Sequence, residues 1–186
     1  GLTSETDYVA YLVAKDDAPF ANVQNAVVSV AFRTTDITDP EHSTTPSLSG
    51  IVGDSVTVDV GLNEPGTCYA VVVAAAAAAP NANEVIAGTG SGGSTPKASG
   101  NVDLNAGNSL SDSIVMSSLT SETAYKAYVV CQDDANYVDA GPNVQDTVEE
   151  LPFTTTDVTP PAFTNGNPAV AALDGVSVTV SISLNE

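Results

Sequence analysis

The sequence contains no tryptophan, a single histidine, and only four lysines and arginines. Those four cations are set against 23 aspartates and glutamates, so the formal net charge at pH 7 is −19. This balance disfavours nucleic acid and anionic membrane surfaces as partners, because both are bound through cationic patches. The charge is typical of a soluble, self-repelling surface, and the alternative is that bound cations offset it.

Patterns that would indicate catalysis or membrane insertion are also missing. No apolar run is long enough to span a bilayer, and no signal peptide opens the chain, which begins at Gly1 without methionine. We therefore expect no membrane insertion, and an excerpt of a longer polypeptide. Phosphate loops, zinc-ligand spacings and nucleophile elbows do not occur, and His42 stands in a predicted inter-domain stretch. No enzyme activity and no organic cofactor are expected.

The residues that are abundant favour an all-β fold. Hydrophobic residues make up 42% of the chain but aromatic residues only 5%, and valine, alanine, serine, threonine, glycine and proline dominate. Branching at Cβ suits valine and threonine to strands, while glycine and proline supply the turns between short strands. A hydrophobic fraction of this size is also enough for a packed core.

Three blocks of sequence recur at offsets of 117, 121 and 122 residues, namely 2–8 with 119–125, 32–40 with 153–161, and 55–64 with 177–186. The first pair shares six of seven residues and the third pair seven of ten. The growing offset places an insertion near 137–141. A period of about 120 residues is one domain and not a solenoid unit. The sequence therefore predicts the end of one repeat over 1–36, a complete repeat over 37–157 and the start of another over 158–186.

Alternation with a period of two predicts the strands of the complete repeat. They are expected over 47–52, 55–62, 67–73, 113–119, 125–131 and 148–155. The run of six alanines at 74–79 is too short for a stable helix and is expected to extend the third strand or to turn into a loop. A second interpretation is that these alanines stand for side chains not identified in an experimental map. Residues 88–93 are expected to form a flexible glycine- and serine-rich loop.

The block Leu119-x-x-x-Thr123-x-Tyr125 resembles the tyrosine corner of fibronectin type III domains. There the tyrosine hydroxyl satisfies backbone groups where the chain crosses between sheets. The resemblance implies tandem Greek-key β-sandwiches of the immunoglobulin or fibronectin type III kind, with extra length at 74–108. The combination of Leu-Asn-Glu-Pro-Gly-Thr, Thr-Thr-Asp-x-Thr-x-Pro and Asp-Asp…Pro-Asn-Val-Gln is also similar to tandem repeats of very large surface proteins of algae and bacteria, which build adhesins, coats or hair-like filaments.

In this fold the strands that carry Cys68 and Cys131 are antiparallel neighbours, which makes a disulfide geometrically feasible. The bond would stabilise the fold by about 4 kcal/mol in the chain-entropy model and would indicate an oxidising, extracellular or cell-surface location. Ala14 occupies the equivalent of Cys131, so the bond is not needed in every repeat. The alternative is a pair of buried free thiols.

Acidic residues gather at the predicted domain junctions and strand ends. Oxygen-rich junctions of this kind can bind Ca²⁺, although no stretch matches an EF-hand loop. The alternative is a solvated acidic face. The candidate ligands are Asp36, Asp39, Glu64, Asp133 and Asp134.

Threonine and proline cluster in the same linkers, whereas no Asn-x-Ser/Thr sequon occurs. Such clusters suit either O-glycosylation or ordinary rigid linkers. The candidate attachment points are Thr44, Thr45, Thr155, Thr159 and Pro160.

Together these features predict a structural repeat of an extracellular filament, coat or stalk, whose partners are copies of itself in a polymer or tandem array and, in addition, covalent glycans. One alternative is an adhesin that binds glycan or protein through loops 81–108 or 133–145, where Tyr137 is the clearest exposed aromatic. The other is an accessory module of a secreted enzyme.

Overall fold

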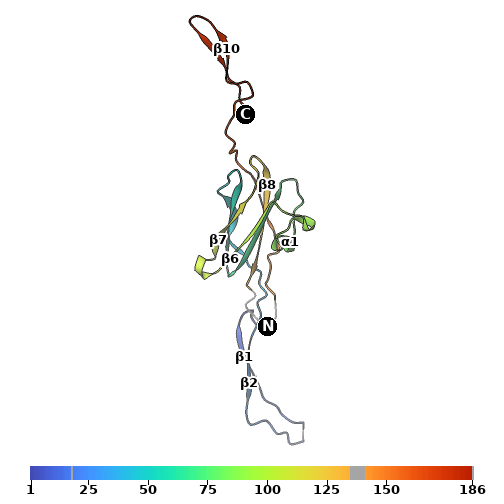
Figure 1. Cartoon of the computed structure of the whole chain (residues 1–186). Helices are drawn as coiled ribbons and strands as arrows, with labels where there is room; N and C mark the ends of the chain where they lie inside the picture. The colour runs from blue at the N-terminus through green and yellow to red at the C-terminus, as the bar shows by residue number, and fades with distance from the viewer. Residues whose placement is uncertain (18, 135–140, 186) are drawn as a thin grey trace.

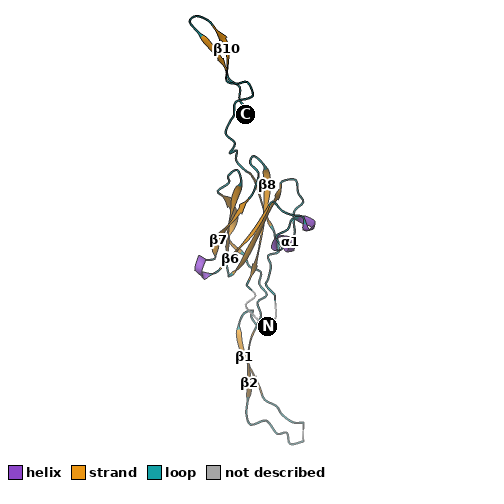
Figure 2. Ribbon diagram, viewed as in Figure 1, coloured by secondary structure: helices purple, strands orange, loops and turns teal. Residues whose placement is uncertain are grey.

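The computed structural model describes residues 1–17, 19–134 and 141–185, and it is an all-β structure with a central sandwich and a two-stranded hairpin toward each end of the chain (Figures 1 and 2). The predicted fold class is confirmed. The two hairpins project from opposite ends of the sandwich, so the molecule is elongated (Figure 1). Tyr137 and most of the predicted insertion at 137–141 lie outside the described residues.

The sandwich consists of two antiparallel sheets. The first sheet has the order β3–β4–β7, with β3 at His42–Ser49, β4 at Ser55–Leu62 and β7 at Ser111–Ser117. The second has the order β6–β5–β8–β9, with β6 at Ala98–Leu104, β5 at Gly66–Ala74, β8 at Ala124–Asp133 and β9 at Glu149–Thr154. The chain crosses from one sheet to the other after β4, after β6 and after β7, as in a Greek key.

The core lies between the two sheets and is built from alternating positions of facing strands. Val56, Val58 and Val60 of β4 are at most 2% exposed, and they belong to one apolar cluster with Tyr125 of β8 and Phe153 of β9. Val56 and Val58 are followed by the less buried Thr57 and Asp59, because successive side chains of a strand point to opposite faces. The alternation in the sequence therefore sets which face of β4 is buried.

A second, smaller core covers the outer face of the four-stranded sheet. The short helix α1 (Ala82–Ile86) places Val85, which is fully buried, against Val71, Val73 and Tyr128. This explains why β5 is apolar at almost every position: one face packs in the sandwich and the other lies under α1. Among the described residues, no helix has the length and hydrophobicity to cross a bilayer.

The segment 81–108 differs from the expectation of a loop, because it contains α1, the strand β6 and the 3₁₀ turns η1 (Ser91–Gly93) and η2 (Ala106–Asn108). The sequence of β6, ASGNVDL, has little strand propensity, and pairing with β5 along its whole length compensates for this. Gly100 is needed there, because a Cβ on it would lie 2.8 Å from Cγ2 of Ile114.

Strand β3 begins and ends earlier than the predicted range 47–52. Its pairing with β4 shifts register twice, so the period-two pattern is interrupted. Pro46 lies within this strand, which is tolerated because β3 is at the edge of its sheet. The alanine run behaves as expected: β5 ends at Ala74, and a turn follows in which the Ala77 N–H donates to the Ala74 carbonyl.

The two hairpins pair in the registers of their counterparts in the sandwich. In β1 (Asp7–Leu12) and β2 (Val28–Arg33), Tyr8 lies opposite Phe32, as Tyr125 lies opposite Phe153. In β10 (Ala169–Leu173) and β11 (Val178–Ser181), Val170 lies opposite Val180, as Leu48 lies opposite Val58. The repeated blocks therefore form the same local pairings even where the opposing sheet is absent.

Candidate functional site

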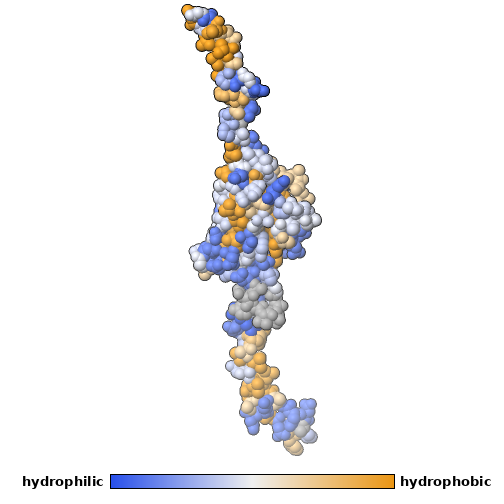
Figure 3. Space-filling view, viewed as in Figure 1, coloured by the Kyte–Doolittle hydropathy of each residue, from blue (hydrophilic) through white to orange (hydrophobic). Residues whose placement is uncertain are grey.

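The most unusual surface of the molecule is the pair of apolar faces on the end hairpins (Figure 3). Val178 is 56% exposed and Val180 is 50% exposed, whereas their counterparts Val56 and Val58 are fully buried in the sandwich. Phe32 is 41% exposed, against 8% for Phe153. Side chains of the same kind in the same register are thus buried in one place and open to solvent in the other. Large exposed apolar surfaces of this kind mark interaction sites.

Tyr125 lies at the corner where the chain passes from β7 to β8. Its hydroxyl accepts a hydrogen bond from the Thr120 N–H at 3.1 Å, and the side chain is 2% exposed. Leu119 is also buried, and the Thr123 hydroxyl donates to the Ser121 carbonyl at 2.8 Å. These contacts are those that the resemblance to a tyrosine corner implies.

The same corner is repeated at the start of the chain. The hydroxyl of Tyr8 accepts from the Thr3 N–H at 2.8 Å, and the Thr6 hydroxyl donates to the Ser4 carbonyl at 2.8 Å. Here the hydrogen bonding lowers the pKa of the half-buried Tyr8 phenol. The corner therefore forms from local contacts, without the opposing sheet.

The predicted disulfide between Cys68 and Cys131 is confirmed. The two cysteines are directly opposite each other on β5 and β8, and both are fully buried in the sandwich core. The bond links the two central strands of the larger sheet across a separation of 63 residues in the chain.

Three of the five predicted calcium ligands come together in space. Carboxylate oxygens of Asp36, Glu64 and Asp133 all lie within 4.8 Å of one another. Asp36 follows the first hairpin, Glu64 lies in the turn between β4 and β5, and Asp133 ends β8. The cluster therefore joins the base of the first hairpin to one end of the sandwich, with a donor set that suits a hard cation.

The electrostatics of this cluster reflect crowding of like charges. Burial raises the pKa of Glu64, and the neighbouring Asp36, Asp133 and Glu5 raise it further. Burial also raises the pKa of Asp134, with Asp103 and Asp133 adding to the effect. Within the cluster, it is the negative charge of Glu64 that its surroundings disfavour.

Asp39 and His42 lie together in a different place, a hollow of about 670 Å³ between the first hairpin and the sandwich, which Glu149 also lines. The Nδ1 atom of His42 is 3.4 Å from the Gly61 carbonyl oxygen, and its Nε2 atom is buried without a hydrogen-bond partner among the described residues. Burial lowers the pKa of this imidazole. Asp39 is therefore not part of the carboxylate cluster.

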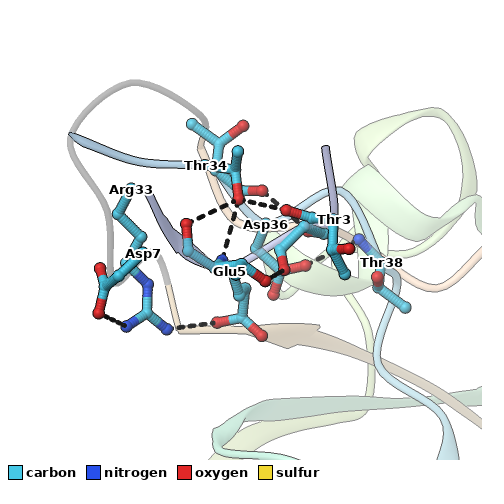
Figure 4. Close-up of polar contacts among 10 residues, drawn as sticks. Thr3, Glu5, Asp7, Arg33, Thr34, Asp36 and Thr38 are labelled. Atoms are coloured by element: carbon cyan, nitrogen blue, oxygen red, sulfur yellow. Dashed lines mark hydrogen bonds and ion pairs between the residues drawn. The ribbon is translucent and has the colours of Figure 1, made fainter. Parts of the chain in front are cut away.

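Polar contacts at the base of the first hairpin hold it in register (Figure 4). The guanidinium of Arg33 lies 3.9 Å from carboxylate oxygens of both Glu5 and Asp7. The Thr34 hydroxyl accepts from the Thr6 N–H at 2.9 Å. Asp36, which belongs to the cluster, accepts from the Thr38 N–H at 2.9 Å and so turns the chain toward β3.

Asn143 and Gln145 were not predicted as site residues. The backbone and side chain of Asn143 donate to the Asp133 carboxylate, and the side-chain oxygen of buried Gln145 accepts from the Cys131 N–H at 2.9 Å. The repeated motif Asp-Asp…Pro-Asn-Val-Gln was the available signal, because its asparagine and glutamine are these two residues. The motif is therefore a brace between a strand end and the loop that returns to it.

The predicted attachment points for sugar differ in accessibility. Thr155 is 3% exposed, and its hydroxyl donates to the Thr120 carbonyl at 2.6 Å. It is used inside the corner and is not available to a glycan, which corrects its inclusion among the candidates. Those that remain exposed are Thr44, Thr45, Thr159 and Pro160.

No protein-family model matches the chain, and no curated protein matches it. Among solved structures, one similar chain comes from a computer-based redesign of a β-sandwich protein. It is 14% identical, covers 67% of this chain and 95% of its own length, and superposes with a TM-score of 0.36.

Proposed function

We propose that the chain is a structural unit of an extracellular filament, coat or stalk, a non-catalytic module that assembles through tandem or strand-complemented β-sandwiches. One observation carries the proposal: the end hairpins expose apolar faces whose counterparts are buried in the sandwich. A lone hairpin is marginally stable in water, because one face of a two-stranded ribbon has nothing to pack against. Covering these faces with further β-structure extends the molecule at both ends.

Three other features support this role. The disulfide is compatible with an oxidising location outside the cell. The hairpins lie at opposite ends of an elongated chain, so contacts there build linear assemblies (Figure 1). Prolines in the linkers, Pro40 among them, restrict backbone rotation between the units. Exposed threonines in the same linkers, such as Thr159, are proposed to carry glycans.

The proposal is tested with the full chain by measuring its mass across a range of concentrations, by light scattering and by electron microscopy. Mass should rise with concentration, and strings of sandwiches should appear. Val180→Asp should reduce association, because it puts a charge into the exposed face of β11. Val176→Asp is the matched control, since Val176 lies in the turn of the same hairpin and is 97% exposed. A monomer at every concentration, with both hairpins protected from hydrogen exchange, would contradict the proposal.

A further inference from the structure

The two end hairpins are complementary halves of one sandwich. β1 and β2 correspond to β8 and β9, which belong to the four-stranded sheet, and β10 and β11 correspond to β3 and β4, which belong to the three-stranded sheet. Within the sandwich these two pairs of strands lie on opposite sides of one core. The hairpins of a single chain project in opposite directions and so do not meet each other (Figure 1).

We infer that β10–β11 of one copy packs face to face on β1–β2 of a second copy, as β3–β4 packs on β8–β9 within the sandwich. The inference rests on the proposed function and names the partner of the end hairpins. In the sandwich, Val58 shares the core with Tyr125 and Phe153. Between copies, Val180 of one chain takes the place of Val58, and Tyr8 and Phe32 of the other take the places of the two aromatic residues.

The aromatic residues already stand in the arrangement that this packing requires. The ring centroids of Tyr8 and Phe32 are 5.8 Å apart, against 5.7 Å for Tyr125 and Phe153. The partner hairpin also closes as its counterpart does. The Asn185 N–H donates to the Ala162 carbonyl, and the Asn185 side-chain oxygen accepts from the Ala162 N–H. Asn63 and Glu41 form the same two hydrogen bonds in the sandwich. Both faces are therefore organised before they meet, which lowers the entropy cost of association.

The register of this contact is set by a projecting side chain and by the open space above a glycine, which we call the notch. Gly53, in the turn between β3 and β4, is covered by Val158, whose two methyl carbons lie 2.6 Å from where a glycine Cβ would be. The counterpart of Val158 is Ile37, which is 76% exposed, and the counterpart of Gly53 is Gly175, which has nothing within 4 Å of its Cβ position. Ile37 of one copy should therefore seat over Gly175 of the other. Val158 stays 61% exposed, so this contact positions the strands and adds little burial.

The charge of the facing strands permits the contact despite the net charge of −19. β10 and β11 contain no charged residue, and the charged residues of β1 and β2 are Asp7 and Arg33, which lie 3.9 Å apart. Packing these faces therefore does not bring the acidic surfaces of two chains together. Because the surfaces in contact differ, the arrangement is head-to-tail and continues as an open string of copies.

The composite sandwich contains the counterparts of four of the seven strands, those of β3, β4, β8 and β9. The apolar faces become buried, while the edges next to β1 and β11 stay open where the counterparts of β5 and β7 would pair. We commit to a second copy as the occupant because the complementary face is present in this chain. A face already covered by other segments of a longer polypeptide is the competing outcome.

The test is disulfide trapping in the full chain with Ile37→Cys and Gly175→Cys together. Oxidation should give a ladder of covalently linked copies that reductant collapses, at least about tenfold more than Ile37→Cys with Val176→Cys, whose second site is one residue away. Gly53→Cys with Val158→Cys should close within one chain and give no ladder. A ladder no stronger than in the Val176 control would count against the inference.

A second variant keeps the test decisive if the new thiols are poorly oriented. Gly175→Leu fills the notch and should weaken association of otherwise unmodified chains by about tenfold, while Val176→Leu should leave it unchanged. Association without a ladder and without any effect of Gly175→Leu overturns this inference and leaves the proposed function standing. Absence of any association overturns both.

Discussion

Asn143 holds both oxygens of the Asp133 carboxylate, its backbone N–H donating to Oδ1 at 2.7 Å and its side-chain amide donating to Oδ2 at 2.8 Å. Asp16 and Asn22 form the same pair in the first hairpin segment, at 2.9 and 3.0 Å. The relationship fixes where the loop after the penultimate strand returns to the sheet. In the sandwich it also sets the position of one member of the carboxylate cluster.

Asn143→Ala should lower the free energy of unfolding by about 1–3 kcal/mol, because the substitution leaves an oxygen of a buried carboxylate without its side-chain donor. The midpoint of urea denaturation measures the effect. Asn101→Ala, at an exposed position on β6, is the control and should change stability by less than about 0.5 kcal/mol. Equal effects of the two substitutions would show that the pair contributes nothing specific.

Replacing both Cys68 and Cys131 by alanine should destabilise the sandwich by about 4 kcal/mol, since the bond closes a separation of 63 residues and restricts the unfolded chain. Alanine is chosen because Ala14 occupies the matching position of the first hairpin segment. Urea unfolding of the variant, compared with the parent in the absence of reductant, gives the value. Addition of reductant should destabilise the parent and leave the variant unchanged; a parent insensitive to reduction under unfolding conditions would argue against this account.

Tyr125→Phe should cost about 1–2 kcal/mol, because the Thr120 N–H loses its acceptor at a part-buried corner while the ring stays in place. Thermal unfolding followed by circular dichroism reports the change. Tyr11→Phe removes a hydroxyl from a ring that is 73% exposed and serves as the comparison. If the two variants melt alike, the hydroxyl of Tyr125 has no structural role.

At about pH 8, Glu64→Gln should raise the free energy of unfolding above that of the parent by up to about 1 kcal/mol. At about pH 4 the two proteins should be equally stable. Burial and like charges raise the pKa of Glu64, so the folded state holds this proton more tightly than the unfolded state does. The favourable contribution is present below the ordinary pKa and is lost as the pH rises through the folded-state value. Urea unfolding at both pH values, without divalent ions, tests the sign, with Asp54→Asn at an exposed site as the control.

In the presence of calcium, the carboxylate of Glu64 is expected to stabilise the chain instead of destabilising it. If Asp36, Glu64 and Asp133 hold the cation, about 1 mM Ca²⁺ should raise the unfolding midpoint of the parent and that of Asp54→Asn, but not that of Glu64→Gln. A shift of the same size in all three proteins would indicate general charge screening. No shift in any of them would contradict a calcium site.

Local sequence patterns predicted much of the fold because many of its contacts form within one strand or within a few residues. The period-two alternation at 55–62 reflects which face of β4 is buried, and the repeated blocks around Tyr8 and Tyr125 form their corner contacts within a few residues. β6 was missed because its sequence has no such pattern and its strand form depends on pairing with β5. The corner role of Thr155 was missed for a similar reason, since its partner Thr120 is 35 residues away.

By itself, the sequence determined the all-β class and the repeated strand pairs, because these follow from alternation and block identity, and it identified Cys68 and Cys131 as a feasible disulfide. Only the tertiary structure decided that Asp36, Glu64 and Asp133 meet, that α1 covers the outer face of β5 and β8, and that the faces of the end hairpins stay open. Those outcomes depend on how distant segments pack, and hydrophobic burial is non-directional, so no local pattern of residues specifies which segment covers which face.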